Sequence, residues 1–432
     1  MTWRFSHKFR RGKNMKIRPL VHAAVLPLVF LPGLALATSG YFATGYGVKS
    51  AGMGGVGIAL PQDGLAAATN PAGTAFVGDR VDLGLTWFMP NRSAEITGSM
   101  APFANGDYDG NDKRNFFIPE LGYVKQFSPQ LSGGVAIYGN GGMNTDYATN
   151  PLRAFGGTGN AGVDLSQLFI SPSLAYKVAP DHSIGIAVNI AYQRFKAYGI
   201  PPVFGFFSES PTNMSDNGYD SAWGWGGRIG YTGKITPELT IGATYATKTY
   251  MGSFDKYQGL FAEQGGFDIP ANWGLGVAWK AIPALTLAFD YQRIQYSGVK
   301  SISNPLDTLF TGNLFGSNNG PGFGWDDVNV YKLGAAYEIG AWTLRGGYTY
   351  VTQPIPQSQT FLNIYAPGVV QNHLSLGATW ATSKTGELSF NYIHAFENTV
   401  NGSGSIPPNF GGGEANLTMY QNSFGVAYGW KF

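Results

Sequence analysis

Residues 184–193 read IGIAVNIAYQ, in which large apolar side chains alternate with small or polar ones. The apolar positions are Ile184, Ile186, Val188, Ile190 and Tyr192. Successive side chains of a β-strand point to opposite faces, so this alternation predicts a strand with one apolar face. The other face is too small and too rich in glycine for a typical water-facing surface. The pattern therefore favours lipid on one side of the strand and a tightly filled interior on the other.

Fourteen segments of this kind follow residue 78. They begin near Val81, Phe116, Leu131, Leu165, His182, Gly224, Leu239, Ala271, Leu285, Val328, Trp342, His373, Gly386 and Thr418. Tight turns between them alternate with connections of about 17 to 28 residues, as in outer-membrane barrels with both termini in the periplasm. We therefore predict an all-β fold, a transmembrane antiparallel β-barrel of about 14 strands over residues 79–432.

The last segment carries aromatic and aliphatic residues at alternate positions from Phe424 to Phe432. Outward aromatic side chains fit the girdle that a membrane barrel places at the lipid–water interface. We expect this strand to close the barrel against the first one.

The N-terminus has the features of a secretory signal peptide. Seven Lys and Arg residues lie between Met1 and Arg18, an apolar stretch follows from Val21 to Leu36, and Ala35-Leu36-Ala37 resembles a cleavage site. The stretch is shorter than the roughly 20 residues of a spanning helix, and prolines interrupt it. We predict that residues 1–37 are a signal peptide and that the protein resides in the outer membrane.

Composition excludes several classes of function. Seven of the 28 basic residues belong to the predicted signal peptide, so the rest of the chain has 21 against 26 acidic residues, a net charge of about −5. A nucleic-acid partner therefore has no electrostatic support. The absence of cysteine excludes disulfides, thiol catalysis and Cys-ligated metals, and no pattern indicates a cofactor or a metal.

Residues 38–78 do not have the pattern of a strand. Gly45-Tyr46-Gly47 and residues 52–57 are too rich in glycine for a stable helix or ladder, and Asn70-Pro71-Ala72 would end the short helix expected before it. A phosphate-binding loop is disfavoured because no Lys-Ser/Thr follows the glycines. Since a fourteen-strand ring is wider than side chains alone can fill, we expect this segment to fold back into the lumen as a plug.

These residues resemble the plug, or hatch, of the outer-membrane transporters of fatty acids and aromatic hydrocarbons (FadL and toluene-transporter type). The match is carried by Gly45, Gly47, residues 50–52, Ala59, Asp63, Gly64, Asn70, Pro71 and Ala72, and it continues over nearly all of residues 40–432. The resemblance implies passive uptake of small hydrophobic molecules, either long-chain fatty acids or aromatic and aliphatic hydrocarbons. It also implies that barrel-insertion machinery recognises the strand that ends at Phe432. We expect a monomer in contact with outer-membrane lipid and lipopolysaccharide.

A glycine-rich stretch, Gly139, Asn140, Gly141 and Gly142, interrupts the third predicted strand. Glycines inside a barrel strand mark a bend or a bulge. The resemblance, which Thr145, Asp146 and Tyr147 extend, implies an inward kink that opens a lateral gap in the wall. The alternative is an ordinary loop that begins early.

The long connections contain more apolar side chains than loops normally do. Examples are Val203, Phe204, Phe206, Phe207, Leu260, Phe261 and Phe267, and further ones lie at 309–310 and 314–315. Large exposed apolar patches mark binding surfaces. The resemblance implies that the loops at 195–221 and 254–270 form a groove that captures ligand. Mutual packing of the loops is the alternative, and packed loops can themselves form such a groove.

Two roles fit Arg194 and Lys196 at the end of the fifth strand: contact with a ligand carboxylate, or contact with lipopolysaccharide headgroups. Their parity with Ile190 and Tyr192 places them on the outer face and favours headgroups. Gly199 stands where the resemblance implies a basic residue, which favours a neutral hydrocarbon over a fatty acid.

Three other classes of protein compete with a transporter. A general diffusion porin needs an open, charged constriction and no plug, whereas this chain is only 12% charged. A structural or adhesive barrel would have polar, repetitive loops. An enzyme is disfavoured because parity places His373 and His394 on opposite sides of the wall, with no serine nucleophile beside either.

Overall fold

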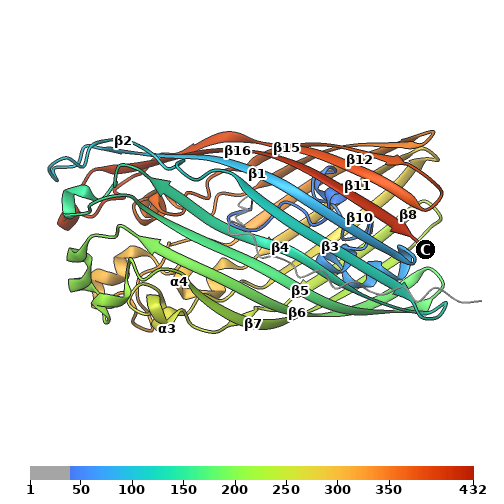
Figure 1. The fold of residues 1–432 in the computed structure, drawn as a ribbon, viewed down its shortest axis with the longest axis horizontal. Coiled ribbons are helices and arrows are strands. Elements are labelled where there is room, and N and C mark those ends of the chain that lie inside the picture. The colour runs from blue at the N-terminus through green and yellow to red at the C-terminus, as the bar shows by residue number, and fades with distance from the viewer. Residues whose placement is uncertain (1–38) are drawn as a thin grey trace, which may run out of the picture. The chain divides into compact units, whose positions relative to one another are not determined.

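Fourteen long strands form one closed antiparallel barrel in the computed structural model, which describes residues 39–432 (Figure 1). The predicted signal peptide, residues 1–37, lies outside the described residues. Each strand pairs with its neighbours in the chain, and pairing of the last strand with the first, from Arg80–Lys431 to Thr97–Glu414, closes the ring. The predicted fourteen-strand barrel is therefore confirmed.

The barrel strands are β1 (Arg80–Thr97), β3 (Phe116–Gln126), β4 (Leu131–Tyr147), β5 (Ala161–Ala179), β6 (His182–Tyr198), β7 (Asp220–Lys234), β8 (Leu239–Ala246), β10 (Asn272–Ile282), β11 (Leu285–Ile294), β12 (Val328–Ile339), β13 (Trp342–Val351), β14 (Asn372–Ala381), β15 (Gly386–Val400) and β16 (Glu414–Lys431). Two short strands, β2 (Gly106–Asp109) and β9 (Tyr250–Met251), pair with β1 and β7.

The alternation in the sequence becomes an outer apolar face and an inner filled one. On β6, Ile184, Ile186 and Val188 are each at least 50% exposed, whereas Gly185 and Ala187 between them are buried. Exposed aliphatic side chains in this number are expected only where lipid replaces water. Among the described residues, no helix is both long and apolar enough to cross a membrane.

The connections alternate in length as predicted, but their lengths vary more. The two connections at 148–160 and 401–413 are shorter than expected, because β5 and β16 begin about four residues earlier than their alternation indicates. The connection at 295–327 is longer because it contains helical turns of its own. Strand pairing above the membrane does not need an apolar outer face, so the apolar pattern misses those strand ends.

Short helices occur only in residues 48–76 and in the long connections, within the described part of the chain. The α-helices are α1 (Val48–Ala51), α2 (Ala66–Thr69), α3 (Ala262–Gly265) and α4 (Lys300–Ser303). The 3-10 helices are η1 (Pro71–Phe76), η2 (Arg153–Phe155), η3 (Pro202–Phe207), η4 (Pro211–Asn213), η5 (Asp255–Tyr257), η6 (Tyr296–Gly298), η7 (Leu306–Thr311), η8 (Gln357–Gln359), η9 (Leu362–Ile364) and η10 (Pro408–Phe410).

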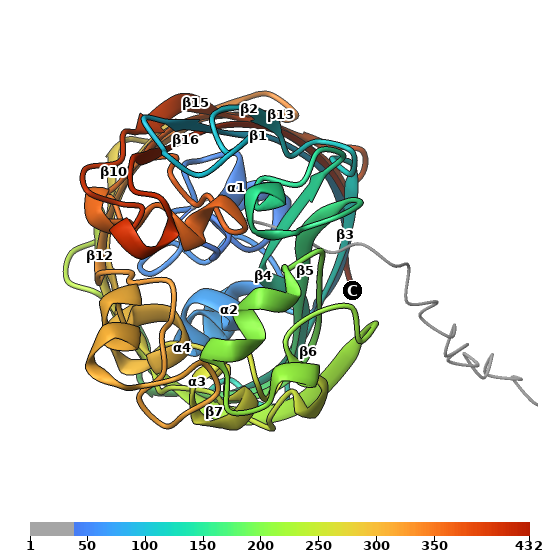
Figure 2. The same cartoon turned by 90° about the vertical axis from the view of Figure 1, so that its left-hand side faces the viewer.

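Residues 39–78, here called the N-terminal segment, lie inside the ring of strands, where Figure 2 shows α1 and α2. The segment meets the wall at inward-facing glycines, so the two backbones come close together. A methyl group on Gly230 of β7 would lie 1.9 Å from Oδ1 of Asn70, and one on Gly347 of β13 would lie 2.2 Å from the amide nitrogen of Gly54. Similar approaches occur at Gly122, Gly185, Gly242, Gly276, Gly334 and Gly377. This close approach accounts for much of the glycine on the inner face.

Candidate functional site

The backbone pairing between β3 and β4 stops part-way along the two strands. The two strands pair from Gln126–Ser132 to Leu121–Ile137. Beyond that pair, β3 continues to Phe116 with β1 as its partner, and β4 continues to Tyr147 with β5 as its partner. The unpaired stretch ends where the amide of Asp146 donates to the carbonyl of Gly110, 3.1 Å from nitrogen to oxygen. We call this unpaired stretch the gap.

A β-bulge at Asn140 lies where β4 leaves β3. Gly139 pairs with Leu168 of β5 and Gly141 with the next residue, Gln167, so Asn140 is the extra residue. A bulge bends its strand and strengthens the local twist. The predicted interruption at Gly139–Gly142 is therefore a bulge inside a strand that continues, and the alternative of an early loop is wrong.

Residues 41–43 of the N-terminal segment pair with β4 at this bulge. Phe42 bridges Gly141, the amide of Ala43 donates to the carbonyl of Asn140 (3.0 Å), and the amide of Gly142 donates to the carbonyl of Tyr41 (3.1 Å). The contact requires glycine at 141, because a Cβ there would lie 1.7 Å from the carbonyl oxygen of Tyr41. The N-terminal segment thus supplies β4 with backbone partners that β3 no longer provides.

A cavity adjoins the gap inside the barrel, with about 550 Å³ of empty space. Ile118 and Glu120 line it from β3, Tyr138 and Gly139 from β4, and the rest of the lining comes from β1, β15, β16 and residues 43–51. Because residues from both sides of the gap line it, we call it the gap cavity.

A second cavity, the loop pocket, lies under the extracellular connections and has about 600 Å³ of empty space. None of the described residues that line it is charged. Its polar groups are the hydroxyls of Tyr365 and Ser301, and the latter donates to the carbonyl of Gly266. The lining consists of Leu152, Val163, Phe195, Ile200, Phe204, Met214, Leu260, Phe261, Ser301, Phe315, Pro321, Gly322, Phe323, Leu362 and Tyr365. A lining of this composition suits a small apolar molecule.

The predicted loop residues fall into three groups. Phe204, Leu260 and Phe261 line the loop pocket. Phe207 packs on Phe410 of another loop, with ring centres 5.7 Å apart, and Phe267 is fully buried below the pocket. Val203 and Phe206 are 38% and 84% exposed and do not belong to the lining. The two readings of these loops therefore overlap, since packed loops enclose the pocket.

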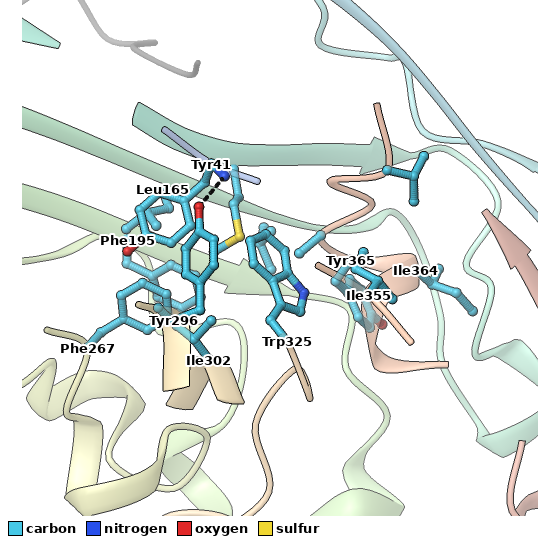
Figure 3. Close-up of a cluster of buried hydrophobic side chains, with 14 of the residues drawn as sticks. Tyr41, Leu165, Phe195, Phe267, Tyr296, Ile302, Trp325, Ile355, Ile364 and Tyr365 are labelled. Atoms are coloured by element: carbon cyan, nitrogen blue, oxygen red, sulfur yellow. Dashed lines mark hydrogen bonds between the residues drawn. The ribbon is translucent and has the colours of Figure 1, made fainter. Parts of the chain in front are cut away.

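An aromatic cluster connects the lining of the loop pocket to the edge of the gap, and Figure 3 shows its members Tyr41, Phe267, Tyr296 and Trp325. Phe261 of the pocket contacts Phe267, with ring centres 4.8 Å apart, and Phe267 contacts Tyr41 at 6.3 Å. Tyr41 also packs on Tyr296 and Trp325. Since Tyr41 hydrogen-bonds to β4 at the bulge, one residue joins the pocket floor to the edge of the gap.

A third cavity, with about 360 Å³ of empty space, lies between the N-terminal segment and β7, β8, β11 and β12. Two cations line it, Arg228 of β7 and Lys332 of β12. Arg228 donates to the carbonyl of Thr69 (3.0 Å), but its Nε has no partner among the described residues. Neither cation is among the residues predicted from the sequence, although the large apolar neighbours Ile229, Tyr331 and Leu333 indicate that both point inward.

Polar side chains of the wall hold the N-terminal segment at many points. Glu120 accepts the amides of Gly47 and Val48, at 3.2 and 3.0 Å, and Asp290 accepts those of Gly57 and Ile58, at 2.7 and 3.0 Å. The predicted motif contributes through Asn70, whose amide group donates to the carbonyls of Ile58 (2.7 Å) and Tyr231 (2.8 Å), while Pro71 and Ala72 pack on Gly185. Gly45 approaches Gly55, and Gly47 has a φ of 88° beside Asp63.

A buried charge cluster fixes the segment to the strands that close the barrel. Glu387 of β15 forms ion pairs with Lys49 of the segment and with Arg80 of β1. Arg80 also pairs with Asp82, at 2.6 Å, and Asp82 accepts the amide of Gly64 at 2.8 Å. All four residues are less than 10% exposed. Removing one member leaves uncompensated charge in a dry environment.

The stability of the N-terminal segment in its position inside the barrel is expected to depend on pH through Asp63. Burial, and after it the carboxylate of Asp82, raises the pKa of Asp63 from 3.8 to about 6 against the opposing effects of Lys49 and Arg80. Glu120 and Arg345 complete the charged surroundings. Because the pKa is raised, protonated Asp63 stabilises the bound position of the segment. This stabilisation is complete below about pH 4 and is lost as the pH rises through about 6.

Hydrogen exchange measures this effect. Amides of residues 47–65 should exchange more slowly at pH 5 than at pH 7.5, after correction for intrinsic rates. The Asp63→Asn variant should remove most of the difference. An equal pH dependence in that variant would show that another group is responsible.

The remaining predicted residues lie apart from the cavities. Arg194 and Lys196 are partly exposed on the outer face of β6, whereas Phe195 between them lines the loop pocket. Gly199 has a φ of 73°, and a Cβ there would lie 2.3 Å from the carbonyl oxygen of Asn160, so the position admits no side chain. His373 points inward and is 1% exposed, whereas His394 lies on the other face and contacts Asn422.

Comparison with known proteins gives consistent matches. The family model described as "Outer membrane protein transport protein (OMPP1/FadL/TodX)" matches residues 34–432. The long-chain fatty acid transport protein of Escherichia coli (strain K12) is 22% identical over 425 residues, which covers 85% of this chain and 92% of that protein.

Two solved structures share the fold. The Pseudomonas putida toluene transporter TodX has a TM-score of 0.67 and 19% identity, over 90% of this chain and 99% of its own. A Pseudomonas aeruginosa FadL homologue has a TM-score of 0.69 and 16% identity, over 91% of this chain and 100% of its own.

Proposed function

Because the chain belongs to the outer membrane protein transport family (OMPP1/FadL/TodX), whose members are transport channels and not enzymes, we propose that it takes up small hydrophobic molecules by passive diffusion. The observation that carries this proposal is the uncharged, almost wholly apolar lining of the loop pocket. Moving apolar surface out of water supplies the driving force, at roughly 25 cal/mol per Å² buried.

The route that we propose runs from the loop pocket to the gap. The ligand enters under the extracellular connections and displaces the aromatic cluster around Tyr41. It then reaches the gap cavity and leaves sideways between β3 and β4 into the lipid. Residues 39–78 act as the plug of this route, because residues 41–43 and 43–51 contribute to the edge of the gap and to the lining of the gap cavity.

The substrate class has two candidates. The loop pocket favours a neutral aromatic or aliphatic hydrocarbon, since its lining has no cation to accompany a carboxylate. The second candidate, a long-chain fatty acid, is favoured by Arg228 and Lys332 in the lumenal cavity, where a carboxylate would meet two cations. The named relatives include one protein of each kind.

Uptake in a transporter-deficient strain tests the function and separates the candidates. We expect faster uptake of labelled toluene, labelled oleate, or both when the protein is present. Leu260→Asp should lower that uptake at least about tenfold, because a carboxylate at the pocket must lose its hydration when an apolar ligand binds.

Phe206→Asp is the matched control, since Phe206 belongs to the neighbouring loop, is 84% exposed and lies outside the lining. It should leave uptake unchanged. Free passage of sugars and ions without uptake of either hydrophobic probe would contradict the proposal and indicate a general diffusion porin.

A further inference from the structure

The outer face of β6 changes from aliphatic to positively charged side chains at Tyr192. Ile184, Ile186, Val188 and Ile190 precede it and are all exposed on the lipid side. Tyr192 packs on Trp223 of β7, with ring centres 5.0 Å apart, and Trp225 lies beside Ile190 in the register. Such aromatic side chains mark the level of the lipid headgroups. Arg194 and Lys196 follow on the same face, so both cations lie immediately outside the aromatic level.

These two cations have no acidic partner within ion-pair distance among residues 39–432. Three other cations near the extracellular strand ends do have one. Lys248 pairs with Asp268 (2.9 Å), Arg293 with Asp327 (3.0 Å), and Lys300 with Glu263 (3.1 Å). The positive charge at Arg194 and Lys196 is therefore available to a partner outside the protein.

Aromatic rings hold the two cations in place. The guanidinium of Arg194 lies 4.1 Å from the ring centre of Tyr219, and the ammonium of Lys196 lies 4.3 Å from Tyr198 and 5.2 Å from Tyr219. The hydroxyl of Tyr219 donates to Asp164 (2.8 Å), which fixes the ring. A cation over a ring keeps its N–H donors for another acceptor.

The acid that faces Lys196 across the strands already has partners. Asp164 of β5 faces Lys196 in the strand register, but it forms an ion pair with Lys113 and accepts the hydrogen bond of Tyr219. Lys113, Arg194 and Lys196 together carry three positive charges, against the two negative charges of Asp164 and of Asp146, which interacts with the Tyr198 side chain. The cluster therefore has a net charge of +1 at neutral pH, a surplus that an anion can neutralise.

We propose that Arg194 and Lys196, with Lys113 beside them, bind a phosphate group of the phosphorylated glycolipid in the outer leaflet. An arginine fork beside a lysine is well suited to phosphate oxygens. The carboxylate of a transported ligand does not fit, because the pocket is reached from the opposite face of β6, where Phe195 lines it. This inference does not rest on the proposed function, since the site lies outside the wall.

Binding of purified rough-type lipopolysaccharide to the full-length mature protein in detergent tests the site. The Arg194→Gln/Lys196→Gln variant should bind it at least tenfold more weakly at 150 mM NaCl than the wild type. The matched control is Arg293→Gln, which removes a cation at the same rim that already has an acidic partner. It should bind as the wild type does. Enzymatically dephosphorylated lipopolysaccharide should lose most of its affinity for the wild type and show no difference between the variants.

Two outcomes would overturn the proposal. One is equal binding of phosphorylated lipopolysaccharide by the wild type and the double variant, with both barrels shown to be folded by heat-modifiable migration on gels. The other is a loss of oleate binding in the double variant with lipopolysaccharide binding intact, which would assign the cations to the transported ligand. Uptake of toluene is measured separately, so failure of the transport proposal would leave this result unaffected.

Discussion

Deletion of Asn140 is expected to lower uptake of the hydrophobic ligand at least about tenfold. Asn140 is the extra residue of the bulge, and Gly139 and Gly141 pair with consecutive residues of β5. Removing it therefore leaves every other residue of β4 with its present partner on β5 and its present face. Without the bulge, the strand loses its cause of bending, and the pairing with β3 can extend beyond Leu121–Ile137. The lateral route would then close.

Asn140→Ala is the control for this deletion. The side chain of Asn140 accepts a hydrogen bond from Tyr46 (2.8 Å) and donates one to Gln167 (3.1 Å), and both are lost in either variant. Alanine keeps the extra backbone residue and hence the bulge, so uptake should stay within about twofold of the wild type. Normal uptake by a folded barrel that lacks residue 140 would rule out an exit between β3 and β4.

Glu387→Gln should raise the frequency of ion-conducting events in planar bilayers by about a hundredfold or more. The substitution leaves Lys49 and Arg80 beside each other without their shared counter-charge. Breaking a buried ion pair in this way costs about 3–5 kcal/mol. Because Lys49 belongs to the N-terminal segment and Arg80 to the wall, the repulsion is relieved when the segment moves out of its position in the lumen. Water and ions would then fill the lumen.

Lys431→Gln is the matched control. Its ammonium lies 3.6 Å from the second carboxylate oxygen of Glu387, and its side chain is 51% exposed. Exposed pairs contribute about 0–1 kcal/mol, so conductance should change little. Unaltered conductance in Glu387→Gln, with a barrel of normal heat stability, would mean that the charge cluster does not hold the segment in the lumen.

The sequence predicts the barrel well because each membrane strand alternates large apolar residues with small or polar ones. Each strand needs an apolar face toward lipid, and this requirement fixes its parity. All fourteen strand positions are correct, and so is the outward direction of Arg194 and Lys196. The N-terminal glycines also carry information, since Gly45 and Gly47 lie where two backbones or a carboxylate approach closely.

The candidate site is less predictable because it depends on contacts between distant segments. The loop pocket joins residues from Leu152 to Tyr365, and no local pattern distinguishes Phe204, which lines it, from Phe206, which is exposed. The partner of Asn140 is equally hidden, since Ala43 reaches it from a segment almost one hundred residues away. Inward parity gives Arg228 and Lys332 a direction but does not show that both line one cavity.

The glycines that face the N-terminal segment have a mechanical consequence. One segment slides past another with difficulty when their side chains interdigitate, because the side chains must separate first. Here the wall has few side chains that interdigitate with the segment, since positions such as Gly122, Gly242 and Gly377 present only a hydrogen atom. Sliding of the segment meets little steric friction, and what resists it is hydrogen bonds and charges that water can replace one at a time. A larger residue at any of these positions would hinder this sliding.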